Sequence, residues 1–165
     1  MSTKTIVISL LVFILAIVGI SVALTAGQKT PSVALTAGQK TPPQTAVAAP
    51  ENIFDFGEIK VTDVKEKDFS LKNSGTKPLQ ILNINSSCNC TAGKIIYNGT
   101  ESKEYGMHAQ SGYLMDIAPN TEAKVRVIYR PSLMPVYGAV EREVYVTTND
   151  PQNNKLVFVI KANVK

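Results

Sequence analysis

Hydrophobic and polar residues alternate in short runs along most of the chain after Glu51, and turn-forming residues separate these runs. A period of two is typical of β-strands, whose successive side chains point to opposite faces of a sheet. The clearest run lies at residues 122–130, where Val125 and Val127 alternate with Lys124 and Arg126. Because residues 52–165 show no helical periodicity, we predict an all-β domain there.

The alternating runs predict seven strands, with turn chemistry such as Asn149-Asp150-Pro151 between them. Their ranges are 53–59, 67–73, 79–86, 112–117, 122–130, 140–148 and 155–164. About seven strands in roughly 115 residues fit an immunoglobulin-like antiparallel β-sandwich with one core. The inner face is predicted to hold Phe54, Phe56, Phe69, Leu71, Ile81, Val125, Val127, Val144, Val146, Phe158 and Ile160.

The N-terminal segment is apolar enough to enter a membrane. Residues 5–24 carry no charge and no proline, and a helix of this length would span about 30 Å, the thickness of a hydrocarbon core. We predict that residues 1–24 form a transmembrane anchor, and that the β domain lies outside the cytoplasm, in the periplasm or extracellular space. Cleavage at Ser21-Val22-Ala23 is the alternative, and the protein would then be secreted.

Between these two parts the chain repeats itself. Residues 21–31 and 32–42 are identical, and each copy contains glycine and ends in proline. Such a composition disfavours a helix, so we predict a flexible linker over residues 25–51. A coil of this length would hold the domain on the order of 30 Å from the membrane.

The net charge of +4 does not indicate a nucleic-acid partner. Three lysines before position 51 account for most of it, which leaves the β domain almost neutral. A basic stripe in the later strands has the spacing of a solvent-exposed strand face, and its members are Lys124, Arg126, Arg130 and Arg142.

Both cysteines of the chain lie in one short segment, Cys88-Asn89-Cys90. In an extended strand their side chains would be about 6 to 7 Å apart, whereas a disulfide needs Cβ atoms about 3.8 Å apart. A disulfide therefore requires a local turn at Asn89. Outside the cytoplasm the pair has three further interpretations, namely a soft-metal clamp, a redox couple and idle buried thiols.

The metal interpretation involves residues that follow the cysteines. Thiolate, thioether and imidazole are ligands that Cu(I) prefers, and Met107 and His108 would complete a site with Cys88 and Cys90. The alternative is that His108 is a solvated loop residue and that no cofactor binds.

Several short motifs carry a family resemblance. They are Phe54-Asp55-Phe56-Gly57, Asn73-x-Gly75-x-x-Pro78-Leu79-x-Ile81, Ser87-Cys88-x-Cys90-Thr91, Asn149-Asp150-Pro151 and Ile160-x-x-x-Val164. In this order residues 52–165 resemble the bacterial immunoglobulin-like family catalogued as domain of unknown function fifteen seventy-three. The resemblance implies a sandwich related to the Hydin and major-sperm-protein type, commonly exported and without an established activity. Two departures are Asn89 in place of the usual glycine and a longer segment at 92–118.

Enzymatic motifs are missing. The single histidine leaves no hydrolase triad, and Asp55-Phe56-Gly57 has no accompanying phosphate loop, so we expect no enzyme. We predict a membrane-tethered binding or scaffold module that presents the Cys88 loop and residues 92–118 to a protein partner. Copper handling through the Cys88-x-Cys90 pair is the first alternative, and a thiol-disulfide redox module is the second.

Overall fold

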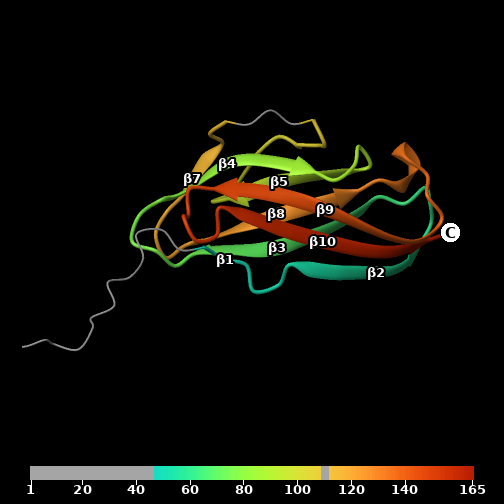
Figure 1. Ribbon diagram of the computed structural model, residues 1–165, viewed down its shortest axis with the longest axis horizontal. Coiled ribbons are helices and arrows are strands. Elements are labelled where there is room, and N and C mark those ends of the chain that lie inside the picture. Colours follow the sequence, from blue (N-terminus) through green and yellow to red (C-terminus); the bar gives the residue numbers. More distant parts are fainter. Residues whose placement is uncertain (1–46, 109–111) are drawn as a thin grey trace, which may run out of the picture. The chain divides into compact units, whose positions relative to one another are not determined.

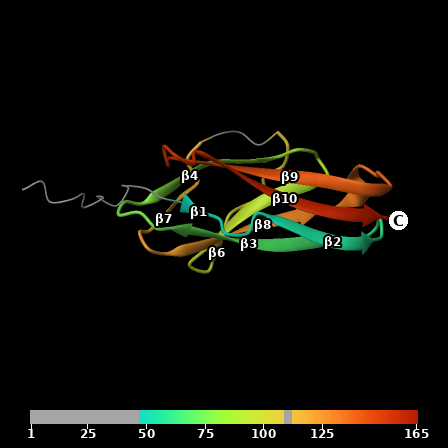
Figure 2. The same ribbon diagram turned by 60° about the horizontal axis from the view of Figure 1, so that its bottom comes forward.

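The computed structural model describes residues 47–108 and 112–165, which form two five-stranded sheets packed face to face (Figures 1 and 2). The first sheet has the order β1 (Val47–Ala48), β3 (Lys65–Asn73), β8 (Glu122–Tyr129), β5 (Thr91–Tyr97) and β6 (Thr100–Glu101). The second has the order β2 (Ile53–Ile59), β10 (Lys155–Val164), β9 (Gly138–Thr148), β4 (Leu79–Ser86) and β7 (Met115–Ile117). A short 3₁₀ helix, η1, covers Pro131–Leu133. The all-β prediction is confirmed.

The predicted N-terminal anchor, residues 1–24, lies outside the described residues, as does the predicted linker up to residue 46. Within the described ranges, no helix has the length and apolar character needed to cross a membrane. The predicted linker is wrong at its end, because Val47 and Ala48 form β1 and pair with β3. Asp150 explains this attachment, since its buried carboxylate accepts a hydrogen bond from the Val47 amide at 2.9 Å.

The predicted antiparallel sandwich has one exception, a parallel pair of strands. β2 runs parallel to β10, with Ile53 opposite Val159 and Ile59 opposite Val164. The cause is that the N-terminal part of the domain changes sheets between β1 and β2. β1 pairs with β3 in the first sheet, and β2 then joins the edge of the second sheet beside the last strand.

The segment 92–118, predicted to be a long surface insertion, begins as an interior strand. β5 lies between β8 and β6 in the first sheet, and its Ile95 is fully buried. The overlooked signal is Asn98-Gly99, whose positive φ values of 49° and 76° close the β5–β6 hairpin. The surface part of the predicted insertion is therefore shorter than expected.

The core forms where the two sheets face each other. The rings of Phe69 and Phe158, one from each sheet, have centroids 5.3 Å apart, and both side chains are fully buried. The predicted inner face is confirmed except at Phe54 and Phe56, which lie on the edge strand β2 and are only partly buried.

On the outer face of the first sheet, carboxylates pair with the basic stripe. Both oxygens of Asp68 accept hydrogen bonds from the Arg126 guanidinium, at 2.6 and 2.9 Å. This bidentate contact lowers the pKa of the Asp68 carboxyl below its ordinary value.

We expect the Asp68→Asn variant to change how stability depends on pH. A lowered folded-state pKa stabilises the fold above the unfolded pKa, and that stabilisation is lost as the pH falls through the folded value. At neutral pH the variant should be less stable by about 1 kcal/mol, and the difference should disappear in acid. Urea unfolding followed by circular dichroism at both pH values measures this. Asp116→Asn is the matched control, because the exposed Asp116 side chain forms no ion pair among the described residues. The prediction would be contradicted if Asp68→Asn lost the same stability at both pH values, or if Asp116→Asn showed the same pH dependence.

Candidate functional site

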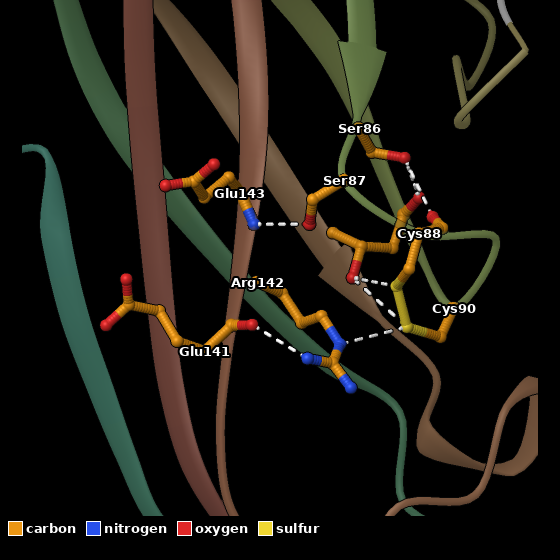
Figure 3. The surroundings of a disulfide bond; sticks show 8 residues. Ser86, Ser87, Cys88, Cys90, Glu141, Arg142 and Glu143 are labelled. Carbon is orange, nitrogen blue, oxygen red and sulfur yellow. Dashed lines mark hydrogen bonds between the residues drawn. A yellow bond between two sulfur atoms is a disulfide. The ribbon is translucent and has the colours of Figure 1, made fainter.

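The cysteine segment forms a tight turn between β4 and β5, closed by a disulfide between Cys88 and Cys90 (Figure 3). The two Cα atoms are 5.3 Å apart, which the turn at positions 89 and 90 makes attainable. The Ser86 hydroxyl lies 2.6 Å from the Thr91 carbonyl oxygen and 2.9 Å from that of Cys88, so it holds both sides of the turn. The Thr91 amide donates back to the Cys88 carbonyl at 3.2 Å.

The two sulfurs have different surroundings. Cys90 is only 1% exposed and belongs to the core cluster, whereas Cys88 is partly buried between the exposed residues Ser87 and Asn89. The Thr91 hydroxyl lies 3.4 Å from the Cys88 sulfur and 3.7 Å from the Cys90 sulfur. One sulfur therefore faces the protein interior, and the other lies nearer the solvent.

A guanidinium points at the buried sulfur. Arg142 Nε donates to Cys90 Sγ at 3.3 Å, and Arg142 Nη1 donates to the Glu141 carbonyl at 2.8 Å (Figure 3). The interpretation of Arg142 as part of a solvent-exposed stripe is thus wrong. The reason is its position in β9, where it shares a face with the buried Val140 and Val144. This parity was visible in the sequence and is the signal that identifies Arg142.

Tyr129 adds a second polar group to this end of the core. Its side chain is fully buried, and among the described residues its hydroxyl has no hydrogen-bond partner. Burial raises the pKa of this phenol, and the nearby positive charge of Arg142 opposes that rise. The charge of Arg142 therefore acts on both a buried sulfur and a buried phenol.

The predicted copper ligands do not converge on the sulfurs. Met107 and His108 line a shallow surface hollow together with Asn89 and Tyr105, but neither cysteine lines it. In the disulfide form the sulfurs are bonded to each other and supply no thiolate pair. Within residues 47–108 and 112–165, no group of three or more His, Cys, Asp or Glu side chains is arranged to hold a metal.

One surface feature beside the cysteine turn was not predicted from the sequence. The β8–β9 loop, residues 131–137, starts where the Arg130 amide donates to the Cys90 carbonyl at 2.8 Å. The loop exposes four large apolar side chains, namely Leu133 (60%), Met134 (46%), Val136 (44%) and Tyr137 (67%). No charged residue occurs between Arg130 and Glu141, and this gap is the signal that identifies the loop.

One family model matches the N-terminal half of the β domain. The model of the family described as "Protein of unknown function (DUF1573)" matches residues 47–106, from β1 through the cysteine turn to the hollow beside it. Residues 47–106 are similar to the DUF1573 family. This match confirms the resemblance for the three motifs before residue 106, whereas Asn149-Asp150-Pro151 and Ile160-x-x-x-Val164 lie outside the matched range. No curated protein matches the chain.

Solved structures share the sandwich of this chain at low sequence identity. A protein of unknown function from Porphyromonas gingivalis W83 superposes with a TM-score of 0.54 and 15% identity, over 78% of this chain and 51% of the other. A family 123 glycoside hydrolase from Clostridium perfringens gives a TM-score of 0.50 and 14% identity, over 69% of this chain and 23% of the other. The chain thus spans about half and about a quarter of these proteins, and the likeness concerns the fold.

Removing the disulfide should leave the β domain folded. Two cysteines separated by one residue close almost no loop, so the double change Cys88→Ser and Cys90→Ser should cost less than about 2 kcal/mol, mostly from a hydroxyl at the buried site. The chain has no tryptophan, so urea unfolding followed by circular dichroism is the suitable measurement. An unfolded double variant would show that the pair is essential to the core.

Proposed function

We propose that this protein is an exported, membrane-tethered module that binds a protein partner through the β8–β9 loop. The observation that supports this function is the exposure of Leu133, Met134, Val136 and Tyr137 within five consecutive positions. Soluble domains rarely expose apolar residues in contiguous groups unless the surface has a partner. The loop lies at the end of the sandwich where the C-terminus also lies (Figure 1).

The loop is held in place before any partner binds. Pro131 is buried, and the amides of Leu133 and Met134 donate to the carbonyls of Arg130 and Pro131, both at 3.1 Å. A fixed loop loses little conformational entropy on binding. Tyrosine and methionine are also enriched at the centres of protein interfaces, where apolar contact and adaptable packing contribute most.

The charges of the domain support a protein partner and not a nucleic acid. Lys124 and Arg126 contact Asp68, and Arg130 binds Glu104 through two hydrogen bonds. These cations are neutralised within the protein, so they offer no free stripe for phosphates. The basic stripe therefore gives no support to a nucleic-acid partner.

Co-purification after formaldehyde treatment of intact cells tests the loop. The full-length chain should capture one protein of defined mass, and the Leu133→Ser and Tyr137→Ser double variant should lose at least about nine-tenths of it, since interface hot spots contribute about 2 kcal/mol or more each. Ile53→Ser is the matched control, because Ile53 is 52% exposed on β2, away from the loop. Equal capture by the loop variant and the control would refute the proposed surface.

The membrane tether has its own test. Because an apolar helix holds a membrane without help from charge, the full-length protein should stay in the membrane fraction after a high-salt wash. Protease added outside the cytoplasmic membrane should release the β domain as a fragment that begins after residue 24. Recovery of the full-length chain in the cytoplasmic fraction would contradict both the tether and the export.

Copper binding by the reduced protein is a second candidate function. Its support is that Asn89, between the two cysteines, lines the same hollow as Met107 and His108. Reduced full-length chain should then gain the mass of one copper ion when Cu(I) is added, and Met107→Ala should weaken binding, because a soft ligand is lost. Absence of a mass gain would exclude this candidate.

A further inference from the structure

We infer that the Cys88–Cys90 disulfide is a site of thiol–disulfide exchange, in which an external thiolate attacks the Cys88 sulfur and Cys90 leaves as a thiolate. This activity is separate from partner binding by the β8–β9 loop. It rests on the unequal surroundings of the two sulfurs and on the side chain that faces each of them (Figure 3).

Access decides which sulfur is attacked. A thiolate must approach one sulfur of the disulfide directly, so burial protects a sulfur from exchange. Cys90 is 1% exposed within the core cluster, and Cys88 is partly buried with exposed residues on both sides. An incoming thiol therefore reaches the Cys88 sulfur first.

The leaving sulfur is the one with a cation beside it. Arg142 Nε lies 3.3 Å from Cys90 Sγ, and the Thr91 hydroxyl lies 3.7 Å from it. A guanidinium and a hydroxyl at these distances stabilise a thiolate, and a thiol of lower pKa is a better leaving group. Among the described residues Arg142 forms no ion pair with a carboxylate, although Glu141 and Glu143 flank it in β9, so its charge is available to the sulfur.

The exchange balances with a thiol as the only co-reactant. In the first step the external thiolate forms a bond to Cys88 Sγ, the Cys88–Cys90 bond breaks, and Cys90 keeps the electron pair as a thiolate. In the second step another external thiolate attacks the mixed disulfide and releases Cys88. The external thiols are oxidised by two electrons to a disulfide, and the cysteine pair is reduced to two thiols, of which Cys90 stays next to Arg142.

Glutathione is the probe that tests this direction of attack. The oxidised full-length chain in mild detergent is incubated with reduced glutathione, quenched early with iodoacetamide and digested. Fragment masses on either side of Asn89 then assign each label. We expect glutathione on Cys88 and carbamidomethyl on Cys90. Glutathione mainly on Cys90, or no adduct when a small model disulfide is fully exchanged under the same conditions, would overturn the inference.

The role of Arg142 is tested by rate. The Arg142→Gln variant should form the adduct about tenfold more slowly. An adjacent opposite charge lowers the pKa of a thiol by about 1 to 3 units, and the rate at which Cys90 leaves depends on part of that shift. Arg142→Lys should restore part of the rate. Arg130→Gln is the matched control, because its guanidinium binds Glu104 and not sulfur, and its rate should match the wild type. Equal rates for the two glutamine variants would contradict the assigned leaving group.

Discussion

Replacing Phe158 with alanine will lower the free energy of unfolding by about 3 to 5 kcal/mol, a large share of the stability of a domain of this size. Phe158 is fully buried in β10, and its ring lies 5.3 Å from that of Phe69 across the two sheets. The variant loses both the transfer free energy of the ring and the packing around the cavity it leaves. Urea unfolding of the full-length chain followed by circular dichroism gives the value.

Lys124→Ala is the control for this prediction. Lys124 lies on the outer face of β8, and its side chain is mostly exposed. Its Nζ atom lies 3.9 Å from Oδ2 of Asp68, which makes only a weak ion pair. Its removal should change the stability by less than about 0.5 kcal/mol. Similar losses at Phe158 and Lys124 would mean that the inner and outer faces of the sandwich are assigned wrongly.

Adding a single methyl group at Gly93 should also destabilise the domain, by about 1 to 3 kcal/mol. A Cβ atom at this buried position would lie 2.5 Å from Val144 Cγ1 and 2.9 Å from Ile84 Cγ2, both on the opposite sheet. Glycine is required in β5 because the sheets approach closely there. The Gly93→Ala variant is measured in the same unfolding experiment.

A second substitution makes this prediction specific. The Val144→Ala background removes the closest clash and leaves only the one with Ile84 Cγ2 at 2.9 Å, so Gly93→Ala should cost less there than in the wild type. Gly106→Ala is the matched control, because a Cβ atom at Gly106 meets nothing nearer than 4.0 Å. Independent, additive losses at Gly93 and Val144 would show that the close approach of the sheets is not the cause.

Alternation predicted the strands that have one buried and one exposed face. β2, β4 and β10 have the predicted bounds because each is flanked by turn residues that end the pattern. β5 was missed because Thr91, Ala92 and Gly93 are all buried, so small residues replace the alternation. A period of two cannot identify a strand that is covered on both faces.

Of the candidate site, only the two cysteines could be predicted from the sequence. The spacing of Cys88 and Cys90 indicates a turn, but it does not reveal that Arg142, remote in sequence, faces the buried sulfur. The β8–β9 loop was missed for the opposite reason. Hydrophobic residues are expected inside a domain, so Leu133 and Tyr137 are informative only when the structure shows them exposed.

Site-specific photo-crosslinking tests the proposed binding surface most directly. A photoreactive amino acid is placed at Val136 in the β8–β9 loop, and, in a control, at the exposed Asp116 of β7, at the opposite end of the second sheet, and intact cells are illuminated. We predict a single crosslinked protein of defined mass from position 136, none from position 116, and loss of the product when Leu133→Ser is added. Crosslinks to lipid alone, or the same product from both positions, would contradict a protein-binding function for this loop.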